Sequence, residues 1–160
     1  MRDDDIRDFV CGVSDLDERL RREAAKAPHK DGLGTFVMKD GDRVTGYYHE
    51  RRIAAFCTVP GGSEPDPSIP AIPLVLLVRF AVDRRWQARG ISGPLLRDAL
   101  LRAATAVARG VVGHTLSARV KPFYLRHGFH SQPDIVDPLG IILATDEIKR
   151  AAAGRAEAAF

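Results

Sequence analysis

A short basic turn contains the residues of this chain whose types and spacing best suit ligand-binding chemistry. Residues Gln87 to Gly93 (QARGISG) follow a run rich in valine and leucine, Leu74 to Val82, and precede a segment with apolar residues at helical spacing. Unpaired N–H groups at the start of a helix bind anions, and Gly90 and Gly93 let a ligand approach the backbone without a Cβ in the way. This order of strand, basic glycine turn and helix predicts a phosphate site, and a pyrophosphate fits it best.

Two common phosphate-binding patterns do not occur in the turn. The Walker pattern ends in Gly-Lys-Ser/Thr, and the dinucleotide fingerprint is Gly-x-Gly-x-x-Gly. The pattern present, Gln87-x-x-Gly90-x-Ser92, resembles the Gln/Arg-x-x-Gly-x-Gly/Ala signature of the GCN5-related N-acetyltransferase (GNAT) family, with serine in place of the last small residue. Taken alone, this match also fits an ordinary turn between a strand and a helix.

Other segments extend the resemblance beyond the turn. VRFAVD before it (78–83), LLRDALLR after it (95–102) and KPFYLRHGF further on (121–129) are similar to the acetyltransferase toxins of bacterial toxin–antitoxin pairs. Near the N-terminus, Phe9-Val10-x-Gly12 followed by Leu16-Asp17 also resembles the start of that branch. The resemblance therefore runs from the N-terminal segment to residue 129.

The family resemblance implies where acetyl-CoA would bind as co-substrate. In GNAT enzymes the central strand leaves backbone groups free, and pantetheine pairs with them as an added strand would. This role falls on Phe80, Ala81 and Val82. The diphosphate would meet the backbone amides of the turn, assisted by nearby arginines. The turn residues implied in cofactor binding are Gln87, Ala88, Arg89, Gly90, Ile91, Ser92 and Gly93.

The arginines have two interpretations that stay open. A formal net charge of +3 is too small to establish a nucleic-acid partner. The arginines are either solvated surface with contacts to the nucleotide cofactor, or they also contact an RNA backbone across the same face. The residues expected to contact RNA under the second interpretation are Arg84 and Arg85 beside the turn, and Arg51 and Arg52 near the end of a predicted strand.

Tyr124 is the candidate catalytic residue. It lies in Phe123-Tyr124-x-x-x-Gly128-Phe129, where it matches the catalytic tyrosine of the GNAT family. A tyrosine with a pKa of about 10 can supply a proton to the leaving thiolate, whose thiol has a pKa of about 8.5. The alternative is that Tyr124 only packs with Phe123 and Phe129.

The central strand contains no Asp or Glu that could act as a general base. An α-amine has a pKa of about 8, and esterification of the neighbouring carboxyl lowers it further, so such an amine is largely neutral without a base. A lysine amine, with a pKa of about 10.4, would need more help. The missing base therefore favours the α-amine of an aminoacyl ester as acceptor.

The resemblance implies a toxin that acetylates the α-amine of aminoacyl-tRNA and so blocks translation. It also implies a small ribbon-helix-helix antitoxin as partner and a homodimer. One alternative is an N-acetyltransferase of a small amine or a protein N-terminus. Another is a catalytically weakened relative with a binding or regulatory role, because the strand after Gly110 is shorter than the family normally has.

The 160 residues fit one domain, predicted at 1–145, with an alanine-rich C-terminal extension at 146–160. We expect the α+β GNAT fold, in which helices flank a mixed, mostly antiparallel sheet with a V-shaped splay between its two central strands. No apolar stretch suits a membrane span or a signal peptide, so a cytoplasmic protein is expected. The five histidines show no metal-ligand spacing, so no metal is expected, and Cys11 and Cys57 are expected as small buried residues rather than a disulfide.

Local patterns place the remaining elements. Ser14 is a candidate cap for a helix that extends to about Lys26, and Asp40-Gly41 predicts a hairpin between two strands. A proline-rich surface loop is expected from Pro60 to Pro73. Further predictions are a strand from Ile53 to Val59, a helix with an apolar face from Ile91 to Val107, a strand from Val111 to Leu116, a helix from Arg119 to His127 ended by Gly128, a strand from Leu139 to Ala144, and a helical or frayed segment from Asp146 to Phe160.

Overall fold

The computed structural model describes residues 4–56, 61–62, 64–132 and 138–158. Its contacts divide the chain into two compact units, each assembled from two segments of the chain. The first unit comprises Met1–Arg51 and Leu77–Arg102, and the second comprises Arg52–Leu76 and Ala103–Phe160. The prediction of one domain at 1–145 stays a prediction beside this division.

A six-stranded sheet organises the fold in the order β1-β2-β3-β4-β6-β5. The pairings of β1 with β2, β4 with β6 and β5 with β6 are antiparallel. The expected mixed α+β class, with a mostly antiparallel sheet, is confirmed, whereas the V-shaped splay stays a prediction. The strands are β1 (Thr35–Asp40), β2 (Arg43–Ala55), β3 (Ile72–Val82), β4 (Gly110–His114), β5 (His130–Ser131) and β6 (Gly140–Ala144).

The hairpin between β1 and β2 confirms the Asp-Gly signal. Asp40 pairs with Arg43, and Gly41 between them has a φ of 58°, which glycine adopts at little cost. The separate strand predicted from Ile53 to Val59 is wrong, because Ile53 to Ala55 continue the 13-residue β2. Residues 57–60 of that prediction, which include Cys57, lie outside the described residues.

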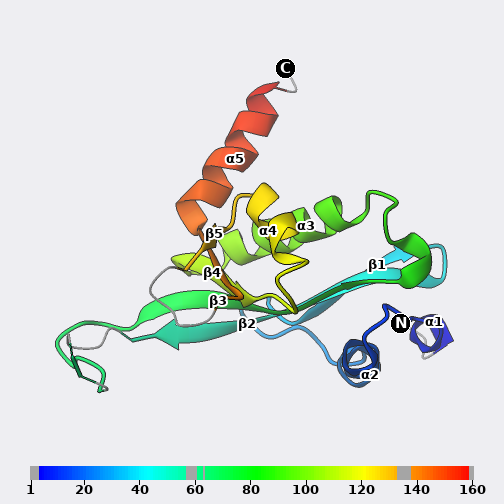
Figure 1. Ribbon diagram of the computed structural model, residues 1–160, viewed down its shortest axis with the longest axis horizontal. Coiled ribbons are helices and arrows are strands. Elements are labelled where there is room, and N and C mark those ends of the chain that lie inside the picture. Colours follow the sequence, from blue (N-terminus) through cyan, green and yellow to red (C-terminus); the bar gives the residue numbers. More distant parts are fainter. Residues whose placement is uncertain (1–3, 57–60, 63, 133–137, 159–160) are drawn as a thin grey trace. The chain divides into compact units, whose positions relative to one another are not determined.

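In the first unit, helices cover both faces of the strands (Figure 1). Successive side chains of a strand point to opposite faces. Tyr47 Oη donates a hydrogen bond of 2.7 Å to the carbonyl of Leu16 in α2 (Ser14–Glu23), on one face. On the other face a Cβ at Gly46 would lie 2.8 Å from Leu95 Cδ2 in α3 (Ser92–Thr105). Glycine at this position therefore lets α3 pack closely against β2.

The N-terminal helices differ in detail from the prediction. The short helix α1 covers Asp4–Arg7, and α2 ends at Glu23 rather than near Lys26. Ser14 is the first residue of α2, whereas Val13 occupies the cap position and makes no side-chain hydrogen bond. The predicted Ser14 cap is therefore wrong. Asp17 in the first turn accepts a hydrogen bond from a backbone amide instead, that of Cys11.

The predicted helix after the turn is confirmed as α3. Its apolar face is buried at Leu95, Leu96, Ala99, Leu100 and Ala103. Val107 does not belong to that face, because the helix ends at Thr105 and the Val107 side chain is 82% exposed.

The second unit contains the predicted C-terminal elements. Strand β4 approaches β6 so closely that a Cβ at Gly110 would lie 2.9 Å from the Leu143 carbonyl oxygen. Helix α4 (Lys121–Arg126) is followed by Gly128, whose φ of 96° suits a helix stop. The two-residue β5 was not predicted, and it takes the edge beside β6. The C-terminal segment, predicted to be helical or frayed, forms helix α5 (Thr145–Ala158), and the buried Ile148 anchors this helix.

Candidate functional site

Asp83 closes β3 and organises the start of the turn. Its carboxylate is fully buried and accepts hydrogen bonds from the Arg85 amide at 2.9 Å, from Arg85 Nε at 3.0 Å and from the Val10 amide at 3.1 Å. Burial alone would raise the pKa of Asp83, but the donors on Arg85 and Val10 outweigh it and lower the pKa. Asp83 is therefore a buried anion at neutral pH, and it caps the 3-10 turn η1 (Arg84–Trp86).

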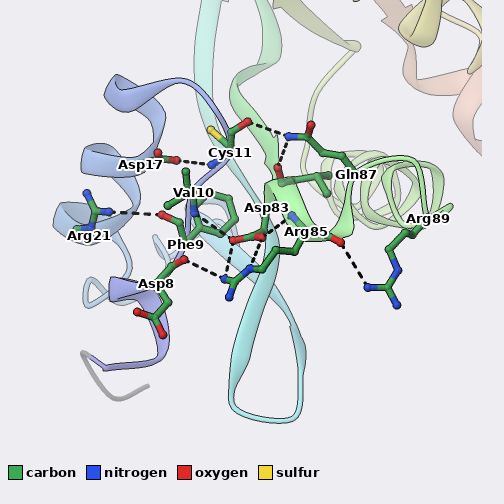
Figure 2. A network of polar contacts seen from close by, with 11 residues as sticks. Asp8, Phe9, Val10, Cys11, Asp17, Arg21, Asp83, Arg85, Gln87 and Arg89 are labelled. Atoms are coloured by element: carbon green, nitrogen blue, oxygen red, sulfur yellow. Dashed lines mark hydrogen bonds and ion pairs between the residues drawn. The ribbon is translucent and has the colours of Figure 1, made fainter.

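Gln87 uses its polar groups to hold the turn. Its side-chain Nε2 donates to the carbonyls of Cys11 at 2.8 Å and Val82 at 2.9 Å, as Figure 2 shows. Its backbone N–H donates to the Asp83 carbonyl at 3.1 Å. The predicted cofactor contact from the Gln87 amide would therefore compete with a bond within the turn.

The next six residues leave their backbone N–H groups available. Within the part of the chain that the structure describes, the amides of residues 88–93 donate no hydrogen bond of good geometry to a backbone carbonyl, and the first such donor after them is Leu95, to Ile91. Ala88 and Gly90 have φ values of 59° and 82°, and α3 begins at Ser92. Amides in such mixed conformations at a helix start form a concave anion site. A Cβ at Gly90 would meet nothing within 4 Å, so the space beside it is open.

The arginines of the turn have different surroundings. Arg85 is bound to Asp83 and also donates to the Asp8 carbonyl at 3.0 Å. Arg89 lies over the Trp86 ring, with 4.3 Å from Cζ to the ring centroid, a distance suited to a cation–π contact. Trp86 thus packs within its loop. The guanidinium of Arg84 lies beside Gly12, where a Cβ would be 3.3 Å from Nη2, so among the described residues Arg89 is the turn arginine without an ion pair whose side chain stays within the turn.

Arg51 and Arg52 are exposed neighbours on β2, so their side chains point to opposite faces. Arg52 Nη1 donates to the Val107 carbonyl at 2.6 Å. The RNA contact expected for Arg51 and Arg52 stays a prediction.

Tyr124 lies in α4 of the second unit. Its ring makes edge contacts with Phe123 at 5.1 Å and with Phe129 at 5.8 Å between centroids. Burial raises the pKa of Tyr124 to about 12, so the phenol stays protonated over the physiological pH range. The aromatic packing orients the ring and is compatible with both the catalytic and the packing interpretations.

Three histidines are bound to single partners. The pairs are Thr35 with His49, Phe123 with His127, and Glu147 with His130. The described ranges contain no group of three or more His, Cys, Asp or Glu residues that could hold a metal ion. Cys11 is a free, half-buried thiol.

Glu50 is a buried acid that the sequence analysis missed. It is 0% exposed on β2, and neither of its carboxyl oxygens has a hydrogen-bond partner. Burial raises the pKa of Glu50 to about 8, despite the opposing charge of Arg102 on α3. Its inward place on the strand, two residues after the buried Tyr48, is a signal that strand alternation could have provided.

Comparison with known proteins identifies the relatives of this chain. No family model matches the sequence. The tRNA-acetylating toxin of Mycobacterium tuberculosis (strain ATCC 25618 / H37Rv) is 34% identical over 148 residues, which cover 88% of this chain and 86% of that protein.

Solved structures of toxins share the fold. The KacTA–DNA complex matches with a TM-score of 0.73 at 24% identity, covering 94% of this chain and 91% of the other. A mutant AtaT bound to the C-terminus of the antitoxin AtaR and to acetyl-CoA matches with a TM-score of 0.69 at 20% identity, covering 95% and 94%. AtaT complexed with acetyl-methionyl-tRNAfMet matches with a TM-score of 0.68 at 23% identity, covering 92% of both chains.

Among the described helices, none has the length and apolar character that a membrane span requires.

The family of this chain follows from three findings that point the same way. They are the fold, the turn before α3, and a relative that is 34% identical over most of both chains. The chain therefore belongs to the family of tRNA-acetylating GNAT toxins.

Proposed function

We propose that this protein is an acetyl-CoA-dependent N-acetyltransferase toxin that modifies the α-amine of aminoacyl-tRNA and thereby blocks translation. The observation that carries the proposal is the run of available amides at residues 88–93, directly before α3. This arrangement suits the diphosphate of a CoA ester. The 34% identical relative is a tRNA-acetylating toxin, and AtaT forms a complex with acetyl-methionyl-tRNAfMet; both support aminoacyl-tRNA as the acceptor.

The amides of residues 88–93 would hold the diphosphate, and Arg84 and Arg89 would add charge-assisted bonds. The backbone of Phe80, Ala81 and Val82 would pair with the pantetheine arm. The Val82 carbonyl already accepts a bond from Gln87, so its second lone pair would serve. Acetyl-CoA supplies the acetyl group as a thioester when bound.

Tyr124 would supply the proton that the leaving sulfur needs. The acceptor nitrogen forms a bond to the acetyl carbon, the C–S bond breaks, the amine loses a proton and the sulfur gains one. The raised pKa of Tyr124 keeps the proton on the phenol until transfer, although it makes the phenol a weaker acid.

The partners and location follow from the family as part of the proposal. We propose a ribbon-helix-helix antitoxin as partner, a homodimeric toxin and a cytoplasmic location. The complex of AtaT with the antitoxin AtaR supports an antitoxin as the kind of partner. Each can be checked by co-expression with the neighbouring gene product and by the mass of the purified species.

The test is transfer of a labelled acetyl group from acetyl-CoA to a pool of aminoacyl-tRNA. We expect charged tRNA to be labelled and uncharged tRNA to remain unlabelled. Rising salt should suppress the reaction because it screens the phosphate contacts. Separately charged tRNAs then identify the preferred amino acid. Labelling of a polyamine or a peptide alone would support the small-amine alternative, and acetyl-CoA binding without any transfer would support a weakened relative.

A further inference from the structure

The N-terminal segment Asp8–Gly12 lies against the phosphate-binding turn, although more than 70 residues separate them in the sequence (Figure 2). We propose that this segment is a brace that fixes the turn in its cofactor-binding shape, with Asp83, Gln87 and Asp17 as positioning residues. The inference rests on the proposed function, because it assigns these residues to the affinity for acetyl-CoA.

The brace is itself firmly held in the first unit. Phe9 is 1% exposed and packs in a core cluster with Leu16, Leu20 and Tyr47, and its ring meets Tyr47 edge-on at 5.6 Å. Asp17 Oδ1 accepts a hydrogen bond of 2.9 Å from the Cys11 amide. The segment thus has an apolar anchor and a polar anchor on α2.

Four hydrogen bonds join the brace to the turn. The Val10 amide donates to Asp83 Oδ2 at 3.1 Å, and the Arg84 amide donates back to the Val10 carbonyl at 2.7 Å. Gln87 Nε2 donates to the Cys11 carbonyl at 2.8 Å. Arg85 Nη2 donates to the Asp8 carbonyl at 3.0 Å. One backbone–backbone bond and three bonds between a side chain and the backbone therefore fix the segment that leads into the amide run.

The turn needs such support because its own shape is unfavourable. Residues 87–90 are exposed, and Ala88 has a positive φ, which costs energy for a residue other than glycine. A loop that must be ordered on binding loses affinity, whereas a loop already held in shape does not. The brace therefore acts on binding of the cofactor, and it touches none of the atoms that react.

This mechanism predicts a split between the kinetic constants. Weakening the brace should raise the Kd and KM for acetyl-CoA and leave kcat at saturating acetyl-CoA close to the wild-type value. A general loss of folded protein would instead lower the apparent kcat and leave the Kd of the folded fraction unchanged.

The experiment uses the full chain and titrates acetyl-CoA by calorimetry. Gln87→Glu keeps the size of the side chain but places a carboxylate against two carbonyl oxygens, so we expect Kd to rise roughly tenfold or more. Asp17→Ala acts from α2 without touching the turn, so we expect a rise of roughly three- to tenfold. Asp17→Asn keeps an acceptor oxygen for the Cys11 amide and should restore most of the affinity.

Val44→Ala is the matched control, because it truncates a buried side chain of the same core cluster that makes no bond to the turn. It should lower the melting temperature and leave Kd unchanged. Limited trypsin digestion gives a second measurement that needs no ligand. Cleavage after Arg84, Arg85 and Arg89 should accelerate in Gln87→Glu and Asp17→Ala, but not in Val44→Ala.

The outcomes separate this inference from the proposed function. If the wild-type protein binds acetyl-CoA and the brace variants bind it equally well, the brace is wrong although the function stands. An equal loss of affinity in Val44→Ala would also overturn it, because stability would then explain the effect. If the wild-type protein does not bind acetyl-CoA, the proposed function fails, and the trypsin pattern alone decides whether the brace fixes the turn.

Discussion

Two carboxyl groups of the first unit, Asp83 and Glu50, are both 0% exposed and yet have opposite electrostatic character. Asp83 receives donors from Arg85 and Val10, and its pKa lies below the ordinary value. Glu50 receives none, and burial raises its pKa to about 8. The comparison shows that burial alone favours the neutral acid and that positioned donors reverse this preference. Asp83 can therefore organise the turn as an anion, whereas Glu50 is a neutral core residue at pH 7.

Of the two acids, Glu50 should have the larger effect on how the stability of the protein depends on pH. Its pKa in the folded state, about 8, lies above the value of 4.5 for an unperturbed glutamate. The folded state therefore holds the proton more tightly, and the stabilisation is lost as pH rises from about 5 through 8. A rise from 4.5 to 8 corresponds to roughly 4–5 kcal/mol at pH 9, an upper value if water enters the folded site.

Glu50→Gln removes this titration, so urea unfolding between pH 5 and 9 should show a flatter profile than the wild type. The variant should gain stability relative to the wild type as pH rises. Equal slopes for the two proteins would mean that Glu50 is already ionised in the fold, and the contrast with Asp83 would be lost.

Tyr124 extends the comparison to the second unit, because the partial burial of its phenol raises the pKa and keeps the proton in place. If the phenol is the general acid, Tyr124→Phe should lower kcat roughly one hundredfold, about 2.7 kcal/mol, and leave the Kd for acetyl-CoA unchanged. Single-turnover transfer to aminoacyl-tRNA measures this directly. A variant with normal turnover would assign Tyr124 to packing with Phe123 and Phe129.

Asp83→Asn tests the charged member of the pair. The amide keeps the shape of the side chain, but it removes the negative charge and turns one acceptor into a donor that faces Arg85 or Val10. We expect a loss of about 2 kcal/mol in the free energy of unfolding at pH 7. Because the pKa of Asp83 is lowered in the fold, the wild type should lose this advantage as pH falls below about 4, and the variant should not. The two urea unfolding curves should therefore converge in acid, and a constant difference would contradict the assignment.

The sequence by itself determined the elements that depend on local pattern. The apolar run before Asp83 predicted β3, the spacing of Leu95, Leu96 and Ala99 predicted α3, and Asp40-Gly41 predicted the hairpin. These signals work because strand alternation, helical periodicity and positive φ at glycine are properties of neighbouring residues. The family resemblance likewise depended on short contiguous motifs.

The tertiary structure decided what lies opposite each residue. The contact of Val10 with Asp83 joins positions 73 residues apart, and the contact of Gln87 with Cys11 joins positions 76 apart, so no local pattern could reveal them. Ser14 suited a helix cap by type, but the chain enters α2 one residue earlier and Asp17 binds the nearby Cys11 amide. The tertiary structure also decides that Asp83 is charged and that Glu50 is protonated, because the pKa of a buried acid depends on which donors the fold brings to it.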